Sequence, residues 1–170
     1  FFNFNYKMCN YLLIYDNKLF VTLGGIKDNV IALDKNTGKL IWSSKGKEEL
    51  SAYCSPMVIE LEDINILVTQ TAVSIMGFDV SSGELLWSHD HPNKWSVQAN
   101  TPIYKDGGLY CFSGYGMGGV MLDVSADGKS ITEKWFDPML DSKMGGAVLI
   151  DDRIYGSGDK NKEWFCMLQQ

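Results

Sequence analysis

The sequence predicts an all-β fold, a β-propeller of four-stranded antiparallel blades, of which about 3.75 are present. A frame of the form Asp-x-x-x-Gly-x-x-x-Trp recurs with a period of 45 residues. Short runs rich in β-branched and aromatic residues fill the intervals, and turns of hairpin length separate them. No stretch sustains the periodicity of a helix. The copies of the frame are Asp34, Gly38 and Trp42; Asp79, Gly83 and Trp87; and, with a stretched turn, Asp123, Gly128 and Trp135.

The first blade is expected over residues 8–44. The Asp34 carboxylate can accept backbone N–H groups one or two residues ahead, and Gly38 supplies the positive φ that closes the hairpin. After this turn, Leu40 and Trp42 are expected on one face of the last strand, with Ile41 on the other. The expected strands are Met8–Tyr15, Leu19–Leu23, Val30–Leu33 and Lys39–Trp42.

The later blades repeat this order over residues 54–90, 98–137 and 144–170, and the last lacks its fourth strand. The third blade has extra residues at its hairpin tip, where a surface position tolerates insertion. The expected strands are Ser55–Glu60, Ile66–Gln70, Ser74–Phe78 and Glu84–Trp87; Thr101–Tyr104, Leu109–Phe112, Gly119–Leu122 and a strand ending at Trp135; and Gly146–Ile150, Arg153–Gly156 and Glu163–Leu168.

All nine residues of the frame are predicted to be structural. Each Asp caps a turn, each Gly allows the turn to close, and each Trp lies on an outer strand against the neighbouring blade. Replacing such a buried Trp by Ala costs on the order of 3–5 kcal/mol. A carbohydrate-stacking role would instead require these indoles to be exposed at the outer edge.

Composition sets wide limits on function. The chain has 170 residues, 45% of them hydrophobic, which is enough for a packed core. Its net charge of -6 disfavours nucleic acid as the main partner, although ordinary solubility explains the charge equally well. No apolar run approaches the roughly 18 residues that span a bilayer, so no transmembrane segment is expected.

The four cysteines, Cys9, Cys54, Cys111 and Cys166, form neither a vicinal pair nor a Cys-x-x-Cys motif. We expect them to be small buried residues in strands, with a disulfide between neighbouring blades as the alternative.

Two further motifs are ambiguous. His89 and His91 could offer a metal pair, but no third ligand is evident, and a solvated loop after the outer strand is the simpler interpretation. The glycine-rich run 114–119 precedes no helix, which favours a flexible loop over a phosphate cradle.

The segment Ala32-Leu33-Asp34-Lys35-Asn36-Thr37-Gly38-Lys39-Leu40-Ile41-Trp42 resembles the repeat of the PQQ-like, or quinoprotein dehydrogenase-like, β-propellers. Residues 77–87 resemble the same repeat less closely. Ser55-Pro56 and Thr101-Pro102 match the Ser/Thr-Pro pair that often begins the first strand of a blade in this family. The likeness is strongest to the bacterial branch labelled polyvinyl-alcohol-dehydrogenase-like. It implies a periplasmic or cell-surface protein.

Such propellers usually have seven or eight blades, so the chain resembles about half of one. It begins with Phe1 and stops where a fourth turn motif is due. An open arc exposes two apolar blade faces. We therefore expect either a fragment of a longer chain, whose remaining blades cover these faces, or self-association.

The resemblance leaves two functions open. The first is a non-catalytic binding or scaffold module. The second is a PQQ-dependent alcohol dehydrogenase whose catalytic groups lie mostly outside these residues. The family's enzymes use a vicinal cysteine pair and a calcium ion. This chain has no such pair, so PQQ and calcium are implied by resemblance alone, catalytic residues stay unknown and no metal ligands are assigned.

A binding site is expected where the loops that enter the innermost strands converge on the propeller axis. Trp95 lies outside the repeated frame, and amide and lysine side chains lie near it in sequence, which suits a small molecule, a glycan or a protein. The alternative is that these residues only line a wet channel mouth. The candidate residues are Tyr53, Gln70, Lys94, Trp95, Gln98, Asn100, Tyr115 and Lys143.

Overall fold

The structure, a computed structural model, describes residues 12–160, 162 and 164–168, and for 165–168 the backbone alone. These described residues form strands and no helix, in three four-stranded sheets and one three-stranded sheet. Within each sheet the strands follow chain order and pair antiparallel with their neighbours. The predicted all-β class and the four-stranded antiparallel blades are confirmed.

The strands of each sheet have the following bounds. The first sheet contains β1 (Leu13–Tyr15), β2 (Lys18–Thr22), β3 (Val30–Asp34) and β4 (Leu40–Ser44). The second contains β5 (Met57–Glu60), β6 (Asn65–Gln70), β7 (Ser74–Asp79) and β8 (Leu85–Asp90). The third contains β9 (Ile103–Lys105), β10 (Gly108–Ser113), β11 (Gly118–Val124) and β12 (Ile131–Asp137). The fourth contains β13 (Ala147–Ile150), β14 (Arg153–Ser157) and β15 (Trp164–Leu168). Residues 8–11 of the expected first strand lie outside the described residues.

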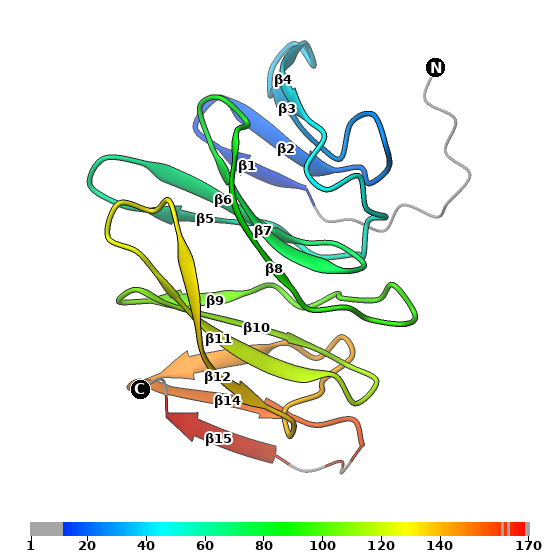
Figure 1. Cartoon of the computed structure of the whole chain (residues 1–170), viewed down its shortest axis with the longest axis vertical. Helices are drawn as coiled ribbons and strands as arrows, with labels where there is room; N and C mark the ends of the chain where they lie inside the picture. The colour runs from blue at the N-terminus through cyan, green and yellow to red at the C-terminus, as the bar shows by residue number, and fades with distance from the viewer. Residues whose placement is uncertain (1–11, 161, 163, 169–170) are drawn as a thin grey trace.

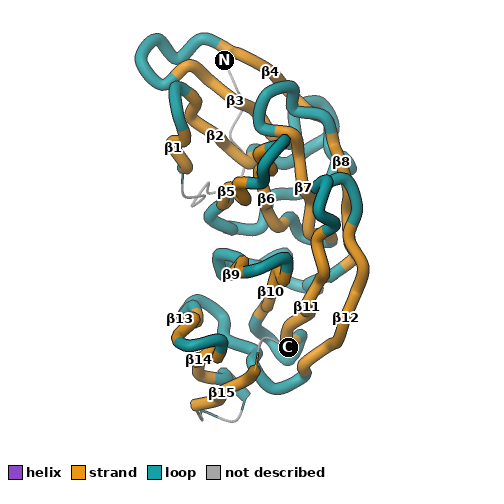
Figure 2. The backbone as a smooth tube through the Cα atoms, turned by 90° about the vertical axis from the view of Figure 1, so that its left-hand side faces the viewer, coloured by secondary structure: helices purple, strands orange, loops and turns teal. Residues whose placement is uncertain are grey.

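The four sheets stack face to face along the longest axis of the molecule (Figure 1). Seen from the side, they fan out along an arc, with β1, β5, β9 and β13 on the inner side (Figure 2). The fourth strands, β4, β8 and β12, lie on the outer side. This is the arrangement of propeller blades about an axis, and the described residues form a partial ring.

Apolar side chains fill the spaces between the sheets. One buried cluster joins the first and second sheets through Phe20, Trp42 and Phe78, and another joins the second and third through Ile66, Trp87 and Leu109. A third joins the last two sheets. The second and third sheets bury their two faces against different neighbours, and the first and fourth each bury one face in this way. Stability therefore rests on contacts between blades.

The outer strands do not alternate as simply as expected. Ala32 pairs with Trp42 while the next residue, Leu33, pairs with Leu40, so Ile41 is an extra residue in a β-bulge. The bulge explains why Leu40 is 60% exposed although Trp42, two residues on, is buried. The prediction that Leu40 and Trp42 lie on the same face of the strand is therefore wrong. The second and third sheets have the same register shift before Trp87 and Trp135.

Two tryptophans of the frame reach across to the next blade. The Trp42 Nε1–H donates to the carbonyl oxygen of Val80 at 3.0 Å, and the Trp87 Nε1–H donates to that of Gly128 at 3.1 Å. The Trp42 ring also covers Gly83, where an added Cβ would lie 2.5 Å from a ring carbon. The turns of the second and third blades thus accept the Trp side chains of the blades that precede them.

Trp135 is half-buried, and its ring lies 5.5 Å from that of Tyr110 within its own sheet. It packs beside the cluster that joins the third and fourth sheets.

The turns are held by carboxylates. Asp34 Oδ1 accepts the backbone N–H groups of Asn36 and Thr37, two and three residues ahead, and Asp79 accepts those of Ser81 and Ser82. Hydrogen bonds from Thr37 lower the pKa of Asp34. The turn glycines Gly38, Gly83 and Gly128 all have positive φ.

The stretched third turn uses a different cap. Asp127 Oδ1 accepts the Lys129 N–H and the Ser125 hydroxyl, whereas Asp123 lies within β11 and accepts from Lys134 Nζ at 3.3 Å. The inserted residues moved the turn away from Asp123, so another carboxylate closes it.

Cys54 and Cys111 are buried free thiols. Burial raises the pKa of Cys54 to about 11, which keeps it protonated. Cys54 precedes β5 rather than lying in a strand, while Cys111 lies in β10. Cys9 and the Cys166 side chain lie outside the described part of the chain.

Candidate functional site

The two ends of the blades differ. We call the end that carries the hairpins of the repeated frame the turn end; it includes residues 34–38, 79–83 and 125–130. We call the opposite end, with residues 71–73, 91–102, 114–117 and 138–146, the loop end. For the second to fourth sheets the loop end lies at the right of Figure 1. It carries both the connections into the innermost strands and the turns between second and third strands.

Four of the predicted binding residues meet at the loop end. The rings of Trp95 and Tyr115 lie 6.2 Å apart and are tilted by 47°. The Lys94 ammonium lies 5.3 Å from the centre of the Trp95 ring, and the Lys143 ammonium lies 4.8 Å from the centre of the Tyr115 ring. We call these four residues the aromatic–lysine cluster. Trp95 is 60% exposed and Tyr115 is 38% exposed, so both rings are accessible.

Buried Asn93 fixes the loop that carries Lys94 and Trp95. Its Nδ2 donates to Ser113 Oγ at 2.7 Å, and its Oδ1 accepts the Trp95 backbone N–H at 2.9 Å. The second contact is an Asx turn, and the first ties the loop to the end of β10. Asn93 thereby holds the loop of Trp95 against the strand that leads into Tyr115.

Tyr115 itself has a φ of 65°, in the left-handed region that a bulky side chain seldom adopts. A non-glycine residue in this region costs on the order of 1–3 kcal/mol, and such strain recurs at functional positions as well as in tight turns. The backbone strain at Tyr115 therefore adds to the reasons for regarding this turn as a site.

Buried Asp141 joins the other side of the cluster. Its carboxylate accepts the Gly116 N–H at 3.1 Å and the Asp159 N–H at 2.7 Å. It connects the Tyr115 turn with the loop after β14. Lys143, two residues on, lies over Gly114 and pairs with Asp159 at 2.7 Å, and this hydrogen bond raises the pKa of Lys143.

A hollow of about 460 Å³ lies beside Lys143. Its walls come from the loop before β13 and the loop between β14 and β15. Met144 and Trp164 are 77% and 79% exposed at its rim. The residues that line it are Ser142, Lys143, Met144, Gly145, Ser157, Gly158, Asp159, Lys162 and Trp164.

Three other candidate residues are buried supports. Gln98 Nε2 donates to the carbonyl oxygens of Thr71 and His91, each at 2.7 Å, and Gln70 Nε2 donates to that of Asn100 at 2.8 Å. Asn100 Nδ2 donates to the Ser142 carbonyl at 2.6 Å. These amides are buried and brace the loops from within. Tyr53 is half-buried, and no contact joins it to the cluster.

Asn93 and Asp141, the two residues that hold the cluster together, are not among the residues predicted from the sequence. Asn93 follows Pro92 and precedes the exposed Trp95, which is a turn signal that could have pointed to it. Nothing in the sequence marks Asp141, because its partners come from two other loops.

The histidine motif is only partly in a loop. His89 lies in β8, with its Nε2 3.4 Å from Glu133 of the third sheet. His91 is 5% exposed, and burial lowers its pKa to about 4. The predicted solvated loop is therefore wrong for His91, which is a neutral buried side chain.

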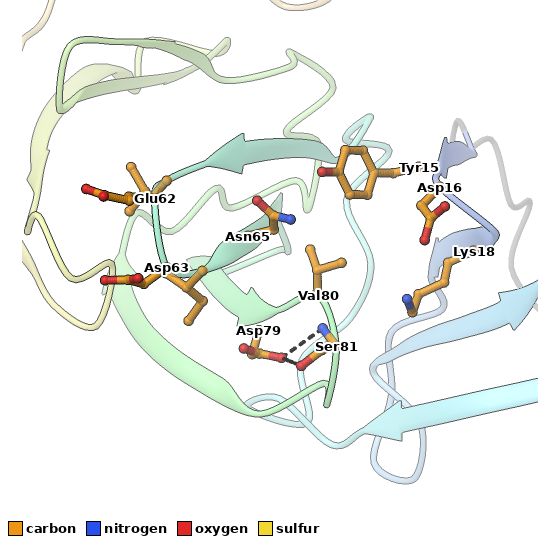
Figure 3. A pocket seen from close by; sticks show the side chains of 11 residues that line it. Tyr15, Asp16, Lys18, Glu62, Asp63, Asn65, Asp79, Val80 and Ser81 are labelled. Atoms are coloured by element: carbon orange, nitrogen blue, oxygen red, sulfur yellow. Dashed lines mark hydrogen bonds between the residues drawn. The ribbon is translucent and has the colours of Figure 1, made fainter.

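A second hollow, of about 330 Å³, lies at the turn end between the first two sheets. In Figure 3, Glu62 and Asp63 project from the β5–β6 hairpin, and the Asp79 carboxylate accepts hydrogen bonds from Ser81 in its own turn. Tyr15 donates to Glu60 at 2.7 Å across the same boundary. The packing of two hairpins explains this hollow, and we assign no ligand to it.

Within the described residues, no three His, Cys, Asp or Glu side chains come together as a metal site. The same residues include no helix long and apolar enough to cross a membrane. The PQQ and calcium implied by the resemblance stay predictions.

The repeat, the four-stranded blades and the Trp contacts between them define a β-propeller module of the PQQ-repeat class. Residues 12–134, more than half of the chain, match the family model described as "Outer membrane protein assembly factor BamB". The chain belongs to this PQQ-repeat family, as the sequence motif predicted.

The chain is also similar to a curated protein described as "Uncharacterized protein RP232" from Rickettsia prowazekii (strain Madrid E). The two are 26% identical over 120 residues, which is 60% of this chain and 29% of that protein. The chain therefore spans less than a third of the length of this relative.

Among solved structures, the chain is similar to a crystal structure of the computationally designed Ika8 protein. The match has 16% identity and a TM-score of 0.41, and it covers 92% of this chain and 57% of that one.

Proposed function

We propose that this chain is a non-catalytic binding or scaffold module whose ligand or partner docks on the loop end. The observation that carries the proposal is the aromatic–lysine cluster. Two aromatic rings and two ammonium groups are grouped there at an accessible surface, outside the repeated frame that holds the blades together.

The support beneath the cluster favours binding. Asn93 and Asp141, both nearly fully buried, fix three loops through hydrogen bonds to backbone and side-chain groups. A surface held in this way loses little conformational entropy when a partner docks, so more of the contact energy appears as affinity. Exposed Trp and Tyr are also the side chains that dominate binding energy at protein interfaces.

We also propose that the module acts in the bacterial envelope, outside the cytoplasm. The support is the description of the matched family, which names an outer membrane protein assembly factor. Fractionation of cells that express the natural gene, followed by protease accessibility of the protein, tests this part. Recovery with cytoplasmic markers alone would contradict it.

The binding proposal is tested by NMR of the indole N–H groups. The chain has five tryptophans, which give five distinguishable indole signals. Trp42 and Trp87 donate to backbone carbonyls between blades and report on the frame, whereas Trp95 reports on the loop end. Peptides, oligosaccharides and small carboxylic acids are added in turn to the labelled protein.

The expected result is that the compounds that bind shift the Trp95 signal in a saturable way and leave Trp42 and Trp87 unchanged. Trp95→Ala should abolish binding of the same compounds. The proposal fails if no compound moves Trp95, or if every binder is unaffected by the substitution.

A further inference from the structure

We infer that the partner at the loop end is an acidic peptide segment bound in an extended form. This inference rests on the proposed binding function and names the chemical class of its partner. It follows from the charge of the surface, from its shape, and from the way that the lysines occupy the aromatic faces.

The charge of the surface opposes that of the chain. The chain as a whole has a net charge of -6, but at this surface three lysines, Lys94, Lys143 and Lys162, stand against the carboxylates of buried Asp141 and of Asp159. The one carboxylate that lines this hollow among the described residues, Asp159, is paired with Lys143. No carboxylate of the described residues forms an ion pair with Lys94. A local group of cations on an acidic protein selects an anionic partner.

The shape of the surface favours a linear partner. Trp95 contacts Tyr115, Lys143 lies over Tyr115, and Lys143 and Trp164 line the same hollow. These contacts form a continuous path from the loop before β9 to the start of β15, across the third and fourth sheets. Exposed Met144 and Trp164 continue the apolar surface beyond the lysines. A path of alternating aromatic and cationic groups suits a chain whose side chains alternate acidic and apolar.

The positions of the lysines favour a peptide over a sugar. A sugar ring stacks on an open aromatic face, but Lys94 lies over Trp95 and Lys143 lies over Tyr115. An ammonium group in this position is attracted to the ring and still has N–H groups to donate. It therefore presents a carboxylate-binding group at the edge of an apolar surface. A peptide carboxylate would accept from these lysines while a neighbouring apolar side chain contacts Trp95 or Met144.

The test uses two fluorescently labelled synthetic decapeptides and the full chain. The first alternates Glu and Leu, and the second has Gln in place of every Glu, so that length and apolar content are unchanged. Binding is followed by fluorescence anisotropy at low and moderate salt. We expect the Glu peptide to bind at least about 10-fold more tightly than the Gln peptide, with the preference decreasing as salt is added.

Matched variants locate the contact. The double variant Lys94→Ala/Lys143→Ala should remove the preference for Glu over Gln. The control Lys39→Ala/Lys129→Ala removes two exposed lysines from the turn end and should keep it. Indole NMR of both double variants checks that the Trp42 and Trp87 signals, and so the frame, are unchanged.

Equal binding of the two peptides, or loss of the preference in the control variant alone, overturns the inference. A sulfated or uronate oligosaccharide serves as a second probe. If it shifts the Trp95 signal saturably while neither peptide binds, the peptide inference is wrong and the binding function survives. If neither the peptides nor the oligosaccharide shifts the Trp95 signal, both the peptide inference and the proposed binding function fail.

Discussion

The turn end and the loop end of this molecule are built from the same strands but use their polar and aromatic residues in opposite ways. At the turn end, the Asp79 carboxylate accepts backbone N–H groups of its own turn, and Trp42 of the preceding blade packs on Gly83 and donates to the Val80 carbonyl oxygen. At the loop end, Trp95 and Tyr115 are exposed above buried polar supports. The side chains of the repeated residues therefore already have partners, and they hold the blades together. Trp95 and Tyr115, which lie outside the frame, remain accessible to a partner.

The largest expected effect is at the turn end. Trp87→Ala should lower the free energy of unfolding by about 3–5 kcal/mol, because it removes a buried indole and its hydrogen bond to Gly128. Trp164→Ala, at a position 79% exposed, should change it by no more than about 0.5 kcal/mol. Urea unfolding followed by circular dichroism measures both. If both variants lost the same free energy of unfolding, the tryptophans of the two ends would not differ in their contribution to stability.

The next effect is on the pH dependence of stability. Burial, with the charge of His89 as a smaller cause, lowers the pKa of His91 from 6.5 to about 4. Between these values the unfolded chain binds a proton at this position and the folded chain does not. The stabilisation from a neutral His91 is thus complete above pH 6.5 and is lost as the pH falls towards 4, by up to about 3 kcal/mol.

Urea unfolding at several pH values from 7.5 to 4.5 measures this loss. In His91→Gln the same interval should show a flatter dependence, because that side chain does not titrate. Parallel curves for the two proteins would mean that His91 is not responsible.

A smaller effect on the free energy of unfolding is expected for two carboxylates at the turn end. Asp79→Ala should lower the free energy of unfolding by about 1 kcal/mol, because it removes the acceptor for two backbone N–H groups. Asp123→Ala removes one exposed ion pair and should lower it by less than about 0.5 kcal/mol. If Asp123→Ala proved the more damaging change, the assignment of the third cap to Asp127 would be wrong.

The smallest effect on stability is expected at Tyr115. Tyr115→Gly removes a side chain from a position with positive φ, so the free energy of unfolding should stay unchanged or rise by up to about 1 kcal/mol. Binding at the loop end should weaken in the same variant. Thermal unfolding and the Glu-peptide titration together check this. A marked loss of stability would show that the Tyr115 ring is a packing element.

The sequence predicted the blades well because the signals for a blade are local. A turn acid, a glycine and a tryptophan at fixed spacing define the hairpin and the contact to the next blade. The β-bulge before Trp42 was missed because a bulge depends on pairing with β3 and not on the strand alone. The change of cap from Asp123 to Asp127 was missed because the insertion added a second Asp, Asp127, beside the Asp123 of the frame.

The loop end could be predicted only in outline. The order of the strands determines which loops lie at the same end of the blades. Trp95 could be singled out because it lies outside the repeated frame. Which side chains point outward depends on hydrogen bonds between distant loops, such as Asn93 with Ser113 and Asp141 with Gly116. For this reason Gln70, Gln98 and Asn100 were grouped with the exposed Trp95 although their side chains are buried.

The most direct test is to measure both stability and binding for Trp95→Ala, with Trp87→Ala beside it. The free energy of unfolding of Trp95→Ala should stay within about 0.5 kcal/mol of the unchanged protein, because this indole is 60% exposed. Its affinity for the alternating Glu and Leu peptide should fall at least about 10-fold, which corresponds to 1.4 kcal/mol of binding. A Trp95→Ala protein that is strongly destabilised yet binds the peptide normally would contradict the division of roles between the two ends.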